Sequence, residues 1–190
     1  MLKRHLFLGY SDGEISLKNN SSATYIAASR YNNTIILYAE SDSESFLPEE
    51  AVTADMIAFP DGRLWVSLPI VFYYNLPEDD DEWVRNKPSE PSFQVSWLKD
   101  EAVSRYVFYH YQLQEENRIR KSRYYIIALF GNMLVSYDEN PPFSANPRKG
   151  CLDTNNTPNS DWKMRMDECF LKKWEVAENI FRADALWNRL

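Results

Sequence analysis

Runs of β-branched and aromatic residues, separated by short turn signals, dominate the first 138 residues. A two-residue turn with positive φ needs Gly, Asn or Asp, and it sets the register of both flanking strands. Four such turns are expected, at Asp12-Gly13, Asn32-Asn33, Asp61-Gly62 and Gly131-Asn132. A fifth is expected at Glu116-Asn117. Together these turns predict antiparallel meanders, because βαβ units need long crossovers instead.

Two of the apolar runs are informative as strands. The run from Leu64 to Leu76 alternates strictly, so one of its faces belongs to a core, and Pro69 places it at a sheet edge or bends it there. The run from Arg105 to Gln114 is mixed on both faces. This pattern predicts a central strand covered on both sides, or a barrel strand that faces a partly polar lumen.

The end of the chain has a different pattern. Residues 162–190 contain no Gly or Pro, and apolar residues recur there at intervals of four, four, three and four: Met166, Phe170, Trp174, Ala177 and Phe181. Asn159, Ser160 and Asp161 are suitable N-cap residues. The spacing therefore predicts one long amphipathic helix over residues 161–188.

These elements predict an α+β fold. We expect about nine to eleven antiparallel strands in a bent sheet, barrel or sandwich, with the long C-terminal helix packed on it. A single domain over residues 1–190 is expected, with a β-rich part over 3–138, a loop over 139–160 and the helix over 161–188. No internal repeat of fixed period is evident.

Charge and composition narrow the function classes. The net charge is -7, and the first 100 residues carry 8 Lys and Arg against 16 Asp and Glu, compared with 13 against 12 in the rest. An acidic body repels nucleic acid and anionic membranes but attracts a basic protein partner. No signal segment or membrane span is recognisable, which predicts a cytoplasmic protein.

Metal and cofactor motifs are lacking from the sequence. Two Cys and two His are too few for a disulfide framework or a four-ligand zinc site. The five Gly residues form neither of the two common phosphate-binding loops. We therefore expect no metal and no cofactor.

His110 is the candidate for small-molecule chemistry, because it lies in a strongly structured segment beside polar and aromatic side chains. A pocket there would be lined by Tyr106, Phe108, His110, Gln112 and Gln114. A general base has this kind of surrounding, and so does a histidine that is hydrogen-bonded within a half-buried sheet. No Ser or Cys nucleophile and no orienting carboxylate can be assigned to His110, which favours the structural interpretation.

Two charged clusters are candidates for partner contacts. The acidic run comprises Glu78, Asp79, Asp80, Asp81 and Glu82, and the basic cluster comprises Arg118, Arg120, Lys121 and Arg123. The acidic run lacks the alternating ligands of a calcium loop, so it is either a solvated loop or a surface for a basic partner. The basic cluster either decorates a hairpin end or contacts an anion or acidic partner.

Six Trp, twelve Tyr and ten Phe supply core residues and interface anchors alike. Trp residues on the predicted C-terminal helix would permit a homodimer through that helix. The leading functional hypothesis is a non-catalytic acidic protein of the inhibitor or immunity type that binds a protein partner. The alternatives are a small-ligand-binding barrel with its pocket around His110, and an enzyme that uses His110 as a general base.

Overall fold

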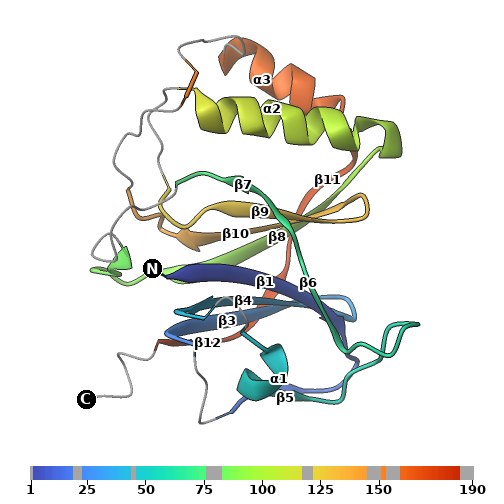
Figure 1. Ribbon diagram of the computed structural model, residues 1–190, viewed down its shortest axis with the longest axis vertical. Helices are drawn as coiled ribbons and strands as arrows, with labels where there is room; N and C mark the ends of the chain where they lie inside the picture. Colours follow the sequence, from blue (N-terminus) through green and yellow to red (C-terminus); the bar gives the residue numbers. More distant parts are fainter. Residues whose placement is uncertain are drawn as a thin grey trace. The chain divides into compact units, whose positions relative to one another are not determined.

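The computed structural model describes residues 2–18, 23–43, 46–75, 83–116, 122–144, 151–152 and 159–184 (Figure 1). The chain divides into unit 1, which comprises Met1–Leu68 and Ala177–Leu190, and unit 2, which comprises Pro69–Val176. Antiparallel sheets dominate both units, which confirms the expected β-rich architecture. The expectation of a single domain over residues 1–190 stays a prediction.

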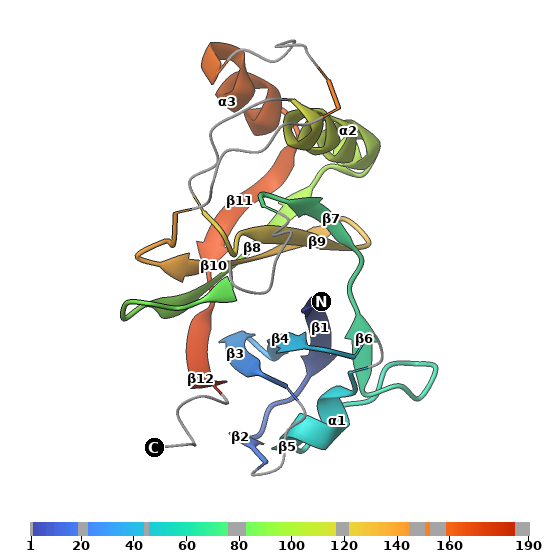
Figure 2. The same cartoon turned by 60° about the vertical axis from the view of Figure 1, so that its left-hand side comes forward.

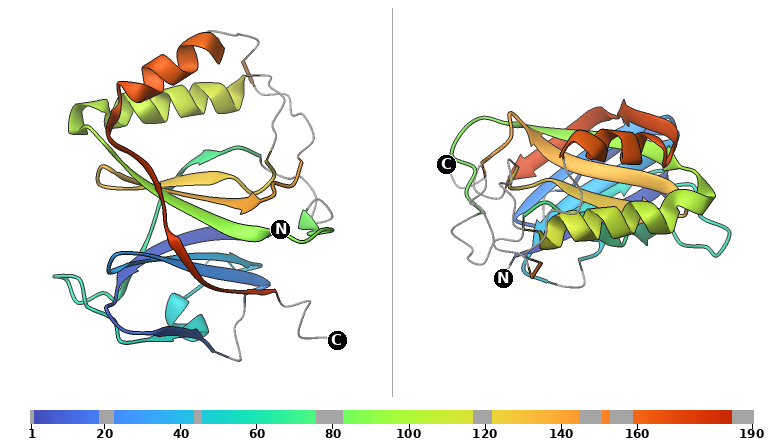
Figure 3. Two further views of the ribbon diagram at one scale, coloured as in Figure 1. Left: turned by 180° about the vertical axis from the view of Figure 1, so that it is seen from behind. Right: turned by 90° about the horizontal axis from the view of Figure 1, so that it is seen from above.

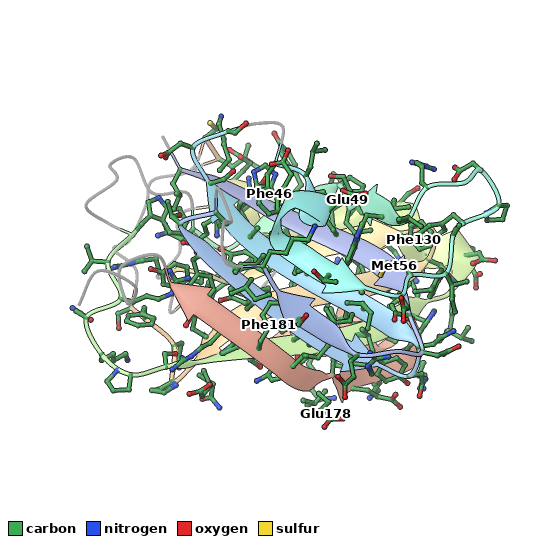
Figure 4. The ribbon with its side chains drawn as sticks, turned by 90° about the horizontal axis from the view of Figure 1, so that it is seen from below. Phe46, Glu49, Met56, Phe130, Glu178 and Phe181 are labelled. Carbon is green, nitrogen blue, oxygen red and sulfur yellow. The ribbon has the colours of Figure 1, made fainter. Side chains whose placement is uncertain are left out.

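Unit 1 is built on a five-stranded antiparallel sheet in the order β12-β3-β4-β1-β6. Its strands are β1 (Lys3–Tyr10), β3 (Tyr25–Tyr31), β4 (Thr34–Ser41), β6 (Trp65–Ser67) and β12 (Glu178–Asp184). A small cover lies over one face of this sheet and consists of β2 (Ile15–Leu17), its partner β5 (Val52–Ala54) and the single-turn helix α1 (Pro48–Ala51). Figure 4 views this side of unit 1, where Phe46 and Phe181 pack against the same apolar cluster.

Unit 2 has a five-stranded antiparallel sheet in the order β11-β8-β10-β9-β7. Its strands are β7 (Ile70–Tyr73), β8 (Glu90–Leu98), β9 (Ile126–Phe130), β10 (Met133–Asn140) and β11 (Phe170–Val176). Helices α2 (Val103–Glu115) and α3 (Asn159–Asp167) cover one face of the sheet (Figure 2). The succession β8-α2-β9-β10-α3-β11 is the β-α-β-β-α-β order of ferredoxin-like folds.

The two sheets have equivalent strand orders. Each strand of one sheet has a counterpart in the other. In the order of the chain, β1 corresponds to β8, β3 to β9, β4 to β10 and β6 to β11. The fifth strands are β7 in unit 2 and β12 in unit 1: β6 runs on into β7, and β11 runs on into β12 (Figure 3). The chain therefore passes between the units twice, before Pro69 and before Ala177.

The central hairpins show the same equivalence at residue level. Shifting the numbering by 99 residues maps the β3–β4 hairpin onto the β9–β10 hairpin, and cross-strand pairs map onto cross-strand pairs. Asn32 and Gly131 correspond, with φ of 55° and 61°. Positive φ is what a two-residue hairpin turn requires. The predicted turns Asn32-Asn33 and Gly131-Asn132 are therefore confirmed.

The long strand predicted from Leu64 to Leu76 is interrupted at Pro69. Before the proline, β6 forms an edge of the unit 1 sheet, and after it β7 forms an edge of the unit 2 sheet. Pro lacks the N–H that a ladder needs, so the chain changes sheets there. The Asp12-Gly13 turn does not close a hairpin, because β2 pairs with β5 and not with β1.

The strand predicted over Arg105 to Gln114 is wrong, because this segment is helix α2. Tyr106 and His110 are its buried residues, and they lie one helical turn apart. The many aromatic residues suggested a strand, but the segment contains no Gly or Pro and few β-branched residues, so it can also form a helix. The longest described helix is therefore central in the chain.

The long C-terminal helix over residues 161–188 is also wrong. Helix α3 runs from Asn159 to Asp167, so the expected N-cap residues lie within the helix, and two strands follow it. An interval of four residues keeps side chains on one face of a helix and also on one face of a strand, so the spacing fitted both. The proposed homodimer through a long C-terminal helix loses its basis.

Candidate functional site

His110 is enclosed in the core of unit 2. Its Nδ1 shares a hydrogen bond of 3.0 Å with the carbonyl oxygen of Tyr106, and the rings of Tyr106, Phe72 and Trp162 lie 4.0, 4.9 and 5.0 Å from it between centroids. Burial lowers the pKa of His110 to about 4, against the smaller raising effect of the Tyr106 hydrogen bond. The ring is therefore neutral at pH 7 and enclosed by aromatic side chains, whereas a general base usually has a pKa nearer to 7; the role of His110 as a general base stays a prediction.

The other four pocket candidates lie in different surroundings. Tyr106 stacks on His110, whereas Phe108 is 59% exposed on the outer side of α2. Gln112 Nε2 donates to Glu116 Oε1 at 3.3 Å, and Gln114 Oε1 accepts from the backbone N–H of Tyr73 at 3.1 Å. The expectation that all five share one strand face is wrong, since successive even positions point in different directions on a helix.

Most of the predicted partner contacts lie outside the described residues. These are Glu78, Asp79, Asp80, Asp81, Glu82, Arg118, Arg120 and Lys121. Arg123 is described, and its guanidinium donates to the carbonyl oxygens of Val84 and Ser144 at 3.3 and 3.1 Å. Arg123 thus links three segments of unit 2. As a partner contact it stays a prediction.

An acidic groove lies in unit 1. It has a volume of about 520 Å³ and is lined by Asp12, Gly13, Glu14, Ile15, Arg30 and Ile180. Asp12 and Glu14 are exposed, whereas Ile15 is buried and Ile180 is half-buried and supplies apolar surface. Glu178, which is labelled in Figure 4, is the cross-strand partner of Arg30 and adds a further exposed carboxylate nearby.

The arginine of this groove holds the loop that carries the acids. Arg30 Nη1 donates to the carbonyl oxygen of Ser11, and Nη2 donates to that of Gly13. Ser11 Oγ donates to the carbonyl oxygen of Asp55 at 2.7 Å and accepts from the backbone N–H of Gly13 at 3.1 Å. The loop is thus fixed on both sides, and its carboxylates are presented on a defined backbone.

A pair of buried tyrosine–glutamate contacts was missed by sequence reasoning. Tyr38 donates its hydroxyl to Glu40 Oε1 at 2.7 Å in unit 1, and Tyr137 donates to Glu139 Oε1 at 2.6 Å in unit 2. The pairs occupy equivalent positions on β4 and β10. The available signal was the Tyr-x-Glu triplet that follows each Asn-containing turn at the same distance.

Asp138, next to Glu139, is an unusual carboxyl group. Burial raises its pKa to about 6, while hydrogen bonds from the Ser122 hydroxyl and the Glu139 backbone N–H act in the opposite direction. The charge of Glu139 raises this pKa further. The end of β10 in unit 2 therefore carries two adjacent carboxyl groups, the half-buried Asp138 and the buried Glu139.

The described ranges contain no group of three or more His, Cys, Asp or Glu residues arranged to hold a metal ion. Among the helices of the described residues, none combines the length and apolarity needed to cross a membrane.

Comparisons with known proteins found little similarity to this chain. No protein-family model matches the chain, and no curated protein matches it. One solved structure, described as a crystal structure study of an anthrone oxidase-like protein, is 9% identical and has a TM-score of 0.38. The match covers 97% of this chain and 93% of that chain. A likeness at this TM-score defines neither the fold nor the function.

Proposed function

We propose that this protein is a non-catalytic binding protein whose acidic groove in unit 1 receives a basic segment of a protein partner. The observation that carries the proposal is the groove itself, because two exposed carboxylates stand beside apolar surface on a hydrogen-bonded loop. Unit 1 carries seven Lys and Arg against eleven Asp and Glu, so the net charge of the unit is negative, as is that of the groove.

A basic segment with interspersed apolar residues matches this surface. Lys or Arg side chains would approach Asp12 and Glu14, and an apolar neighbour would cover the half-buried Ile180. Arg30 does not compete for the acids, since both of its terminal nitrogens donate to backbone carbonyls. Attraction of this type is screened by salt, so binding should weaken as ionic strength rises.

The test is an NMR titration of the full chain with a synthetic peptide of alternating Lys and Leu. Saturable shifts are expected at residues 12–15, 30 and 180. The double variant D12N/E14Q should weaken binding by about 2- to 30-fold, since exposed ion pairs contribute about 0.2–1 kcal/mol each.

The matched control is E49Q/E50Q, which removes the same charge from exposed positions on α1. It should bind the peptide as the native protein does. Equal weakening by both double variants would reduce the effect to net charge and refute the groove as the binding site. The absence of localised shifts would refute it as well.

A further inference from the structure

The outer face of helix α2 in unit 2 presents two aromatic side chains to solvent. Phe108 is 59% exposed and Tyr111 is 56% exposed. Ser104 is also exposed, and Glu115 is half-buried. These four residues follow one another at intervals of four, three and four positions, which is the spacing of a seam between two helices. They therefore form an outer stripe along α2, on the side opposite to its buried residues.

Helix α3 lies beside the outer stripe and leaves it open. Arg105 Nη1 lies 4.0 Å from Glu168 Oε2. Arg165 Nη1 donates to the Tyr109 hydroxyl at 3.3 Å. These contacts place α3 along the flank of α2 that carries Arg105 and Tyr109, and Figure 3 shows the two helices side by side. Aromatic side chains are enriched where proteins associate, so the outer stripe is a surface that a partner can bury.

The outer stripe is complementary to a second copy of itself. When two α2 helices pack antiparallel about a two-fold axis, Phe108 of each copy faces Tyr111 of the other. The same register brings Ser104 opposite Glu115, because the two pairs have the same midpoint in the sequence. Arg105 follows Ser104 directly, so its guanidinium comes close to Glu115 of the second copy. Four aromatic rings thus meet at the centre, and a pair of opposite charges lies at each end.

Arg105 and Glu115 are accessible for this contact. The Arg105 side chain is 45% exposed, and its distance of 4.0 Å from Glu168 is long for an ion pair. Glu115 Oε2 accepts a hydrogen bond from the backbone N–H of Cys151 at 3.3 Å, and a carboxylate can accept about four. Ser104 has a small side chain, so it leaves room between the helices for the longer arginine and glutamate. A parallel pair of helices would instead bring like charges together.

We propose that the outer stripe of α2 is the contact surface of a homodimer. The occupant is a second copy of this chain, bound antiparallel with Phe108 and Tyr111 of both copies at the centre. A helix of 13 residues is about 20 Å long, so the interface is smaller than that of stable dimers. The dimer is therefore weak, with a Kd on the order of 100 µM. Helix α2 belongs to unit 2, so the proposal is independent of the acidic groove in unit 1.

Sedimentation equilibrium of the native full chain between about 10 µM and about 1 mM tests the dimer. The average mass should rise from that of the monomer towards that of the dimer over this range. The double variant F108S/Y111S should weaken dimerisation by about 100-fold or more, because each lost ring is missing twice in the dimer. A native chain that remains monomeric at about 1 mM would overturn the proposal, and so would undiminished association of the double variant.

The matched control is L47S/I57S, which removes two exposed apolar side chains from unit 1. Leu47 is 52% exposed and Ile57 is 44% exposed, so the loss of exposed apolar surface is comparable. This variant should associate as strongly as the native chain does. Equal weakening by the two double variants would show that exposed apolar surface in general drives the association, and it would refute α2 as the contact surface.

Charge reversal tests the antiparallel register. R105E and E115R should each weaken dimerisation by about 2- to 30-fold, because two exposed ion pairs per dimer become repulsive contacts. The double variant R105E/E115R exchanges the two charges and should restore the native Kd to within about threefold. A double variant that associates no more tightly than the single ones would refute the Arg105–Glu115 contact and the register that depends on it.

Discussion

Units 1 and 2 have equivalent strand orders, but they cover their sheets differently. After β1, a turn at Asp12-Gly13 is followed by Ile15 and Leu17, which alternate as in a strand and form β2. After β8, thirteen residues without Gly or Pro form α2. The same order of sheet strands therefore accepts either an extended or a helical cover.

The two covers also differ in what they bury. The aromatic cluster of unit 2 includes Tyr106, which is 1% exposed and stacks on His110 at 4.0 Å. In unit 1, Phe46 is 4% exposed and contacts the rings of His5 and Phe7 at 5.9 Å each. Each histidine therefore belongs to an aromatic cluster of its own unit: His5 lies on strand β1, and the more deeply buried His110 lies on helix α2.

The largest expected effect on stability comes from truncating one buried aromatic side chain in each unit. Y106A should lower the free energy of unfolding by about 3–5 kcal/mol, and F46A by about 3 kcal/mol, because ring removal loses burial and leaves a cavity. Urea denaturation followed by tryptophan fluorescence measures both values. If the chain is one domain, both variants shift a single transition. A larger loss for F46A would show that the extended cover is the more important one.

The two histidines should differ in their effect on acid stability. Because the folded-state pKa of His110 lies below its unfolded value of about 6.5, its contribution is complete above pH 6.5 and is lost as the pH falls towards 4. The loss is about 3 kcal/mol. Burial also lowers the pKa of His5, although this ring is only half-buried.

Stability curves between pH 4 and 7 test this difference. The curve of H110Q should be flatter than that of the native protein, whereas H5Q should change the slope much less. The variant H110Q also loses ring packing, which lowers stability by the same amount at every pH. A curve for H110Q that runs parallel to the native one would contradict the assignment of a neutral, buried His110.

The smallest expected effects concern the two equivalent hairpin turns. N32G should stabilise the protein by up to about 0.5–1 kcal/mol, and G131A should destabilise it by about 1 kcal/mol, because both positions have positive φ. A Cβ at Gly131 meets nothing within 4 Å, so the backbone conformation alone sets the cost. Thermal melts of both variants provide the measurement. A destabilising N32G would contradict the equivalence of the turns.

Part of the candidate site was accessible from sequence and part was not. The acidic surplus of the N-terminal half and the Asp12-Gly13 turn were visible, and both contribute to the acidic groove. The groove also needs Arg30 from β3 and Ile180 from β12, which approach the turn only through sheet pairing. Glu139 likewise acquires its partner Arg85 from a segment 54 residues away.

The sequence by itself determined the hairpins at Asn32-Asn33 and Gly131-Asn132, because such turns depend on neighbouring residues. It did not determine α2 or the strands β11 and β12, whose apolar spacings fit both helix and strand. Pairing with β8 and β3 makes the last two segments extended. The internal equivalence was also hidden, since the hairpins share only four of 17 residues: Tyr25, Asn33, Tyr38 and Glu40 match Tyr124, Asn132, Tyr137 and Glu139. A fold of this kind is fixed by contacts between distant strands, and those contacts exist only in the tertiary structure.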